Sequence, residues 1–204
     1  SSGDVWLDDA NLAAMPESSL MDIRRHRMGM VFQNFGLVPH FTALQNIAFP
    51  LKVRGEAAAD CAAKAAEMLS LVGLDGRGDA YPSELSGGQQ QRVGIARSLA
   101  VDPEVWLLDE PFSALDPLIR KQLQDELLAL QARLRKTIIF VTHDFSEAVR
   151  LADRIAIMRD GRIIQQGRAA ELLMRPADDY VSRFVGDVSR LQVLRLGDVM
   201  QPAT

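Results

Sequence analysis

Acidic residues and a histidine follow two apolar runs of the sequence. Asp109 and Glu110 come directly after the run 105–108, and His143 closely follows the run 138–141. In an open α/β sheet, ligands bind beyond the carboxyl ends of the strands, where these side chains would lie. An aspartate there can hold a magnesium ion through water, and a neighbouring glutamate can orient or deprotonate the water that attacks a phosphate. A carboxylate pair can equally cap the next helix, and a histidine at a strand end is often a hydrogen-bonded structural residue.

A short segment with two glycines precedes a predicted helix and consists of Ser86, Gly87, Gly88 and Gln89. Glycines let the backbone approach a ligand closely, and a helix N-terminus offers free N–H groups and the positive end of its dipole to a phosphate. The alternative is a serine that only caps the helix after a loop. Leu85 before the segment, with Gln91 and Arg92 after it, favours the phosphate-binding interpretation. We expect the helix to continue to about Ala100.

Two further polar residues are candidates for the same site. Gln33 follows the apolar run 28–32 and would lie at the tip of a strand, although a glutamine there can also simply face solvent. Asp116 precedes Pro117, and proline is favoured at the first position of a helix, so Asp116 is also a candidate helix cap. Capping and ligand contact are compatible roles for this residue.

Strands and helices alternate in the second half of the sequence. The runs 105–108 and 138–141 are continuously apolar, which predicts strands buried on both faces of a parallel sheet. Between them, an apolar stripe at helical spacing predicts one long helix: Ile119, Leu123, Leu127, Leu130 and Leu134. Strand, helix and strand form a parallel crossover unit, and the segments 155–158 and 162–166 predict a hairpin. The predicted fold class is therefore α/β, with a parallel sheet and an antiparallel edge.

Other predicted elements flank this unit. We expect a strand end at 5–7, an irregular segment at 34–50, and helices at 20–27, 56–72, 146–151 and 169–184.

Length and composition limit the classes of function. With 204 residues, of which 48% are hydrophobic and 25% charged, the chain is long enough for one main domain. The net charge of -4 argues against nucleic acid as a partner, because such binding rests on a basic surface. A single cysteine, Cys61, leaves no disulfide framework and fits a reducing compartment. The apolar runs are far shorter than the ~20 residues that cross a bilayer, so a membrane role would need another chain to span it.

The order and spacing of these motifs resemble those of the ABC ATPase family, and the resemblance covers residues 1 to about 186. It implies a P-loop NTPase-type core, a parallel sheet with helices on both faces, and a helical signature subdomain at about 43–100. It also implies ATP and Mg²⁺ as cofactors. Glu110 would be the catalytic base, Asp109 the metal-binding acid of the Walker B pair, and Gln33 the Q-loop residue that contacts magnesium and water.

The same resemblance implies roles for the other candidates. The signature would comprise Ser86, Gly87, Gly88 and Gln89. In the family this segment binds the γ-phosphate of ATP held by the partner subunit, so a second copy in a head-to-tail dimer is an expected partner. Asp116 would belong to the D-loop beside the nucleotide, and His143 would be the switch histidine that contacts the γ-phosphate.

The segments 113–120 and 176–181 resemble, more narrowly, the ATPases of glycine betaine/proline importers. That resemblance implies a transmembrane permease and an external substrate-binding protein as partners, and a peripheral position on the cytoplasmic face of the inner membrane. The aromatic segment from Phe35 to Phe49 would line the groove for the permease's coupling helix. The stretch 197–202 resembles the first strand and turn of a CBS domain, so 187–204 would be a linker and the start of that domain.

One family motif is missing, because the sequence contains no G-x-x-x-x-G-K-[ST] loop, whose amides and lysine hold the β- and γ-phosphates. We therefore expect that the chain lacks the N-terminal strands and this loop, and that it is not a competent ATPase as written. Two rival hypotheses remain: a nontransport ABC protein that acts on DNA or the ribosome, and a noncatalytic fragment that binds a partner. The acidic balance and the importer-like segment 113–120 weigh against the first, whereas the sequence upstream of Ser1 would decide the second.

Overall fold

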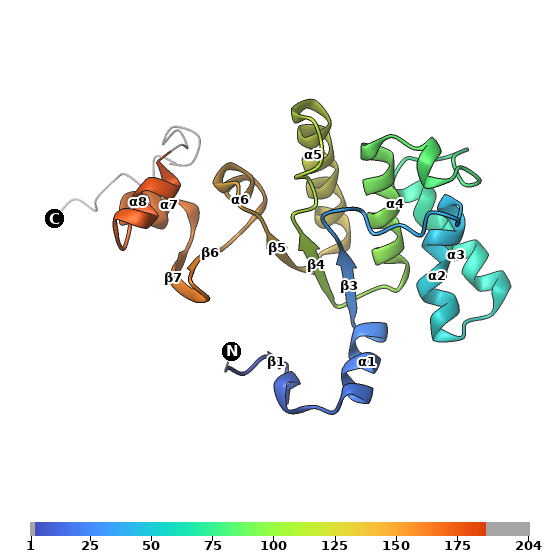
Figure 1. The fold of residues 1–204 in the computed structure, drawn as a ribbon, viewed down its shortest axis with the longest axis horizontal. Coiled ribbons are helices and arrows are strands. Elements are labelled where there is room, and N and C mark those ends of the chain that lie inside the picture. Colours follow the sequence, from blue (N-terminus) through green and yellow to red (C-terminus); the bar gives the residue numbers. More distant parts are fainter. Residues whose placement is uncertain (1–2, 187–204) are drawn as a thin grey trace. The chain divides into compact units, whose positions relative to one another are not determined.

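The computed structural model describes residues 3–186 (Figure 1). The chain divides into two compact units, Ser1–Val141 and Thr142–Thr204. The segment 187–204, which we predicted to be a linker and the start of a CBS domain, lies outside the described residues. Within the described part of the chain, no helix is both long and apolar enough to span a membrane.

The first unit is built on a parallel sheet with the strand order β3-β4-β5. Its strands lie side by side (Figure 1) and are β3 (Met28–Val31), β4 (Val105–Asp109) and β5 (Thr137–Val141). Met30 lies opposite Leu107, which in turn lies opposite Ile139. Parallel pairing brings the three carboxyl ends to one edge of the sheet, and the predicted α/β fold class is confirmed.

One face of this sheet packs tightly against α4 (Gly87–Ala100), which is followed along the chain by β4 and α5 (Pro117–Leu134). Trp106 of β4 is fully buried, and its indole Nε1 donates a 2.8 Å hydrogen bond to Ser98 Oγ of α4. A Cβ atom on Gly29 would lie 2.6 Å from the Ser98 carbonyl oxygen, so the glycine lets α4 approach β3 closely. Leu108 is equally buried, which completes an apolar layer on this face.

The other face of the sheet is open. Ile139 and Val141 of β5 are 54% and 51% exposed, and Met30 of β3 is 38% exposed. The prediction that the run 138–141 is buried on both faces is therefore wrong for the chain as described. The reason is that neighbouring side chains of a strand point to opposite faces, and the helices of the first unit cover only one of the two faces of β5.

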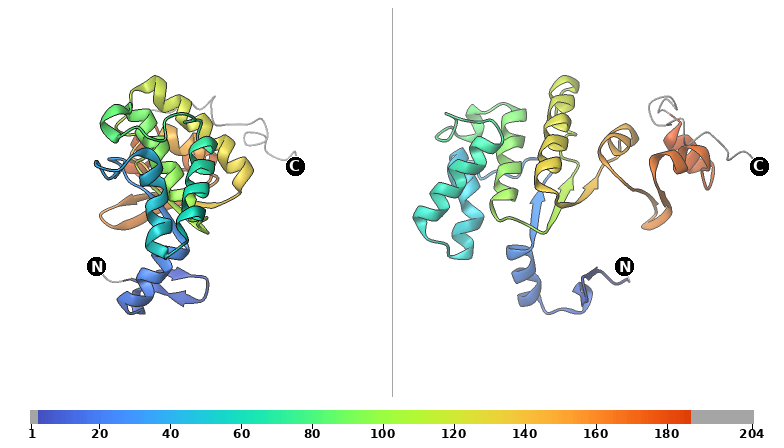
Figure 2. Two further views of the ribbon diagram at one scale, coloured as in Figure 1. Left: turned by 90° about the vertical axis from the view of Figure 1, so that its right-hand side faces the viewer. Right: turned by 180° about the vertical axis from the view of Figure 1, so that it is seen from behind.

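Three helices stand together beside β3 (Figure 2), because α2 (Ala43–Arg54) and α3 (Ala58–Leu71) both pack on α4. The prediction of an irregular segment over 34–50 is wrong from Ala43 onward. Pro50 lies inside α2, where it removes one backbone hydrogen bond, yet Ile47 and Leu51 on the buried side keep the helix in place. A capping box of Thr42 and Gln45 begins the helix.

The N-terminal part of the first unit contains a short hairpin and one helix. The elements are β1 (Trp6–Leu7), β2 (Ala10–Asn11), the 3-10 turn η1 (Leu12–Ala14) and α1 (Glu17–His26). Arg27 donates hydrogen bonds to both Asp8 and Glu104, which ties the hairpin to the start of the sheet. The hydrogen bond from Arg27 lowers the pKa of the Glu104 carboxyl below its usual value.

The second unit begins with α6 (Phe145–Leu151) and continues through an antiparallel hairpin and two helices. These are β6 (Ile155–Arg159), β7 (Arg162–Gly167), α7 (Ala169–Met174) and α8 (Asp179–Val185). Asp160 and Gly161 both have positive φ, as a tight hairpin turn requires, so the hairpin prediction is confirmed. The single helix predicted over 169–184 is wrong, because Pro176 separates α7 from α8.

Candidate functional site

Gln33 and Glu110 meet beyond the ends of β3 and β4. Gln33 Nε2 donates a 3.0 Å hydrogen bond to Glu110 Oε2. The contact follows from the register, since Val31 pairs with Leu108 and both side chains lie two residues further on. Asp109, the last residue of β4, lies opposite Val141 of β5. The structure thus brings together at one sheet edge three of the residues that the sequence singled out.

The backbone at Glu110 holds its side chain at this edge. Its φ is +43°, a left-handed conformation that is uncommon for a residue other than glycine. Glu110 N donates to the Val141 carbonyl oxygen of β5 at 2.9 Å, and the Ser113 hydroxyl donates to the Glu110 carbonyl oxygen at 3.0 Å. Phe112, fully buried two residues later, anchors the turn beside Phe140. Surrounding structure therefore fixes a carboxylate in a conformation that the chain alone would rarely adopt.

The signature segment begins α4 through a capping box. Gln89 N donates to Ser86 Oγ at 3.3 Å, and Ser86 N donates to Gln89 Oε1 at 2.9 Å. The helix predicted to end near Ala100 does so. The simple capping role is therefore real, and the predicted phosphate contact of the segment stays a prediction.

Both glycines of the signature have close protein neighbours. A Cβ atom on Gly88 would lie 2.7 Å from Ile119 Cγ2, and one on Gly87 would lie 3.4 Å from the Leu115 side chain. Between these neighbours, Asp116 Oδ1 accepts hydrogen bonds from the backbone N–H groups of Leu118 and Ile119 and so caps α5. The start of α4 and the start of α5 are thus packed together, which explains why glycine is needed there without any ligand.

His143 belongs to the second unit and is exposed. The neighbouring residue Asp144 caps α6, since its Oδ1 accepts from the N–H groups of Ser146 and Glu147. Thr142 Oγ1 donates to the buried Glu147 side chain at 2.9 Å. These contacts define the turn that presents His143, whose predicted role at the γ-phosphate stays a prediction.

Sequence reasoning missed two polar side chains, one half-buried and one fully buried, that hold the segment after Gln33. Arg97 of α4 donates to the carbonyl oxygens of Phe35 and Gly36. Asn46 of α2 is fully buried and bonds to the backbone of Val38 and of the two residues before the helix. Asn46 lies among the apolar positions of the buried side of α2. A buried amide needs hydrogen-bond partners, so this pattern could have identified Asn46 as a residue that binds the neighbouring backbone.

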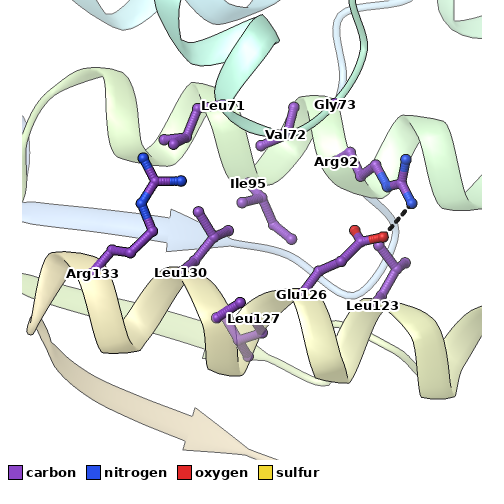
Figure 3. Close-up of a pocket in the computed structure, with 11 residues that line it drawn as sticks. Leu71, Val72, Gly73, Arg92, Ile95, Leu123, Glu126, Leu127, Leu130 and Arg133 are labelled. Atoms are coloured by element: carbon purple, nitrogen blue, oxygen red, sulfur yellow. Dashed lines mark hydrogen bonds and ion pairs between the residues drawn. The ribbon is translucent and has the colours of Figure 1, made fainter.

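Neither of the two cavities described next includes Gln33 or Glu110 in its lining. A groove of about 450 Å³ runs along the outer edge of β3, with mainly apolar walls and several arginines: Met21, Arg24, Arg25, Met30, Phe32, Gly36, Phe49, Val53 and Arg97. A smaller cavity of about 260 Å³ lies between α3, α4 and α5 (Figure 3). Arg92 and Glu126 form an ion pair at one end of it, and Arg133 reaches over the other end. Among the described residues, no group of three or more His, Cys, Asp or Glu side chains could hold a metal ion.

Comparison with known proteins gives a consistent result. The sequence model of the ABC transporter family matches residues 1–113. The trimethylamine N-oxide transport system ATP-binding protein TmoW of Pelagibacter ubique is 57% identical over 98% of this chain and 59% of its own length. The glycine betaine/carnitine transport ATP-binding protein GbuA of Listeria monocytogenes is 51% identical over 98% of this chain and 50% of its own length.

A solved structure is similar as well. The ATP-binding cassette MJ0796, in a dimeric post-hydrolysis state bound to ADP and Pi, superposes with a TM-score of 0.72 at 34% identity. The match covers 82% of this chain and 74% of that chain. The chain spans about half to three fifths of the length of the curated relatives it matches.

Proposed function

The chain belongs to the ABC transporter family, and from this membership we propose that it forms part of the ATP-hydrolysing subunit of an importer for glycine betaine-like osmoprotectants. The relatives' names specify trimethylamine N-oxide, glycine betaine and carnitine, which share a methylated nitrogen. The hydrogen bond between Gln33 and Glu110 at the strand ends is the observation that carries the proposal. The experiments below use a full-length protein, by which we mean a polypeptide of the relatives' length that contains this chain.

Glu110 is the proposed general base. Its carboxylate is aimed by the Gln33 amide and by the backbone hydrogen bond to β5, so little reorientation is needed to accept a proton from water. Asp109 and the amide oxygen of Gln33 are hard oxygen donors of the kind Mg²⁺ prefers, and these residues would hold the ion. Bound magnesium supplies charge neutralisation on the phosphates during phosphoryl transfer.

A second copy of the subunit is the proposed partner at the signature. Ser86 is exposed at the start of α4, and a helix N-terminus favours a phosphate group. The dimeric state of MJ0796 supports a paired arrangement. The G-x-x-x-x-G-K-[ST] loop would come from another segment of the full-length protein. The open face at Ile139 and Val141 supports this, because parallel sheets are normally covered on both sides.

A permease is the proposed partner at the groove along β3. Exposed apolar patches of this kind mark interaction sites, and Phe49 and Phe32 in the groove are 42% and 45% exposed. Gly36 and Phe49 place parts of the predicted coupling segment in its wall. An external binding protein would select the substrate, and the ATPase would lie on the cytoplasmic face of the inner membrane. A CBS domain would begin at 197–202.

The test uses the full-length protein reconstituted with its permease in vesicles. We expect ATP hydrolysis that rises when a substrate-loaded binding protein is added on the opposite side. A rate of ATP hydrolysis that is unchanged by the permease but rises with DNA or ribosomes would support the hypothesis of a nontransport ABC protein. A full-length protein that binds its permease and hydrolyses no ATP would instead support the noncatalytic hypothesis.

A further inference from the structure

The segment that follows Gln33 makes a turn in an unfavourable backbone conformation. Phe35 and Gly36 both have φ near +58°, so two successive residues are left-handed. A phenylalanine rarely adopts this conformation, because its Cβ crowds the backbone. Two local hydrogen bonds close the turn, from Phe35 N to the Phe32 carbonyl and from Gly36 N to the Asn34 carbonyl. Such a turn persists when contacts from outside the segment stabilise it.

Arg97 of α4 supplies those contacts. Its Nη1 donates to the Gly36 carbonyl oxygen at 2.6 Å, and its Nη2 donates to the Phe35 carbonyl oxygen at 3.0 Å. One planar guanidinium therefore spans two successive carbonyl groups, which a lysine ammonium cannot match in geometry. Burial lowers the pKa of the Arg97 guanidinium, because the charged form is partly removed from water. Partial burial of this charge is unfavourable, and the two hydrogen bonds to backbone oxygens compensate for it. We therefore interpret Arg97 as a residue that stabilises the turn.

The helix is shaped to bring Arg97 to this turn. A Cβ atom on Gly94, one helical turn before Arg97, would lie 3.4 Å from the Phe35 carbonyl oxygen. At the other end of α4, a Cβ atom on Gly87 would lie 3.8 Å from the Phe35 ring. The turn thus lies along the same helix that begins at the signature. Gly36 and Arg97 also line the groove along β3.

We propose that Arg97 is a positioning residue that fastens the turn at Phe35 and Gly36 to α4, so that Gln33 and the signature helix move together. This inference rests on the proposed function, since it concerns how Gln33 is kept in reach of Glu110. We call the two hydrogen bonds from Arg97 to the Phe35 and Gly36 carbonyl groups the Arg97 clamp. A partner bound in the groove would contact this clamp directly, because Gly36 and Arg97 line the groove. Arg97 does not touch the proposed reacting groups and acts through the backbone.

A second anchor provides an internal reference for testing this. Asn46 of α2 accepts from Val38 N at 2.8 Å and donates to the carbonyl oxygens of Val38, Phe41 and Thr42. The loop is therefore held at two places by two different helices. Removing the Arg97 contacts should loosen the amides of Phe35 and Gly36 while Val38 stays protected.

The first experiment measures amide hydrogen exchange in the full-length protein without nucleotide. Arg97→Met keeps the length of the side chain and removes its donors, and we expect exchange at residues 35 and 36 to rise at least about tenfold, because hydrogen bonds from a charged donor are lost. Arg92→Met is the matched control, since it removes another arginine of α4 whose partner is Glu126 on α5. Equal protection of residues 35 and 36 in both variants would overturn the proposal.

The second experiment separates positioning from general stability. Arg97→Met should lower kcat for ATP hydrolysis at least about tenfold while changing ATP affinity less than about twofold, and Arg97→Lys should restore part of the loss. Parental kcat in Arg97→Met, with ATP hydrolysis present in the parent, would contradict the role of Arg97. Loosened amides in a protein whose parent hydrolyses no ATP would leave the clamp standing and overturn the proposed function instead.

Discussion

The two faces of the β3-β4-β5 sheet differ in packing, although the same strands supply both. On one face Trp106 is fully buried and bonded to Ser98 of α4. On the other face Ile139 and Val141 leave about half of their surface in water. Both faces are apolar in sequence, so the difference lies in what covers them. The apolar sequence and the exposure therefore disagree on this face, because exposure depends only on the elements that lie against it.

Two carboxylates, Asp109 and Glu110, stand at the end of β4, and they differ in which face of the sheet they lie on. Asp109 shares the side of Leu107 and Ile139 by strand alternation, so it lies on the open face. Glu110 follows in the next position and is turned by its positive φ toward Gln33. The two acids are therefore adjacent in sequence yet differently supported. An element that covers the open face would bring its own groups beside Asp109 and leave the Glu110 contact in place.

The largest expected effect concerns these two acids. In the full-length protein, Glu110→Gln should lower ATP turnover by about 10²–10⁴-fold, as loss of a general base does, while nucleotide binding is kept. Asp109→Asn should instead weaken magnesium-dependent nucleotide binding. The measurements are steady-state hydrolysis and nucleotide titration with and without Mg²⁺. Parental turnover in Glu110→Gln would remove this residue from the role of base.

The packed face should be the most costly to damage. Trp106→Ala removes a fully buried indole and leaves Ser98 Oγ without its donor, so we expect a loss of about 3–5 kcal/mol in the free energy of unfolding. Denaturant unfolding followed by circular dichroism measures this quantity. Trp106→Phe is the control, since it keeps an aromatic ring in the core and loses the hydrogen bond, and it should cost clearly less. A loss below 1 kcal/mol, roughly the scale of a surface change, would contradict the tight packing of this face.

Sequence reasoning was reliable where one physical signal dominated. The apolar runs of β4 and β5 and the apolar stripe of α5 predicted three elements in the right order, because strands and helices space their apolar residues differently. Local rules failed where tertiary packing decided the outcome. Pro50 inside α2 is tolerated because the helix buries its other side, and the Arg97 clamp joins residues far apart in sequence. The contact between Gln33 and Glu110 was predictable only as proximity, since its geometry depends on the register.

Close approach on the packed face gives a smaller test. A Cβ atom on Gly29 would lie 2.6 Å from the Ser98 carbonyl and 2.8 Å from the Pro103 side chain. Gly29→Ala should therefore push α4 away from β3 and cost about 1–3 kcal/mol of stability, as overpacking does. Unchanged stability in Gly29→Ala would show that the two layers are less tightly packed.

The smallest expected effect bears most directly on the open face. In the full-length protein, Ile139→Thr keeps a β-branched side chain in the strand, so strand propensity changes little. If another element covers this face, the loss of apolar burial should cost about 1–2 kcal/mol. The 54% exposure of the Ile139 side chain would instead predict a change within about 0.5 kcal/mol, as for surface sites. Ile163→Thr in β7, where the parent side chain is 57% exposed, is the matched control and should stay within that smaller range. Equal, small losses at both positions would mean that the face stays open in the full-length protein, and the apolar character of β5 would then need an explanation other than a covering element.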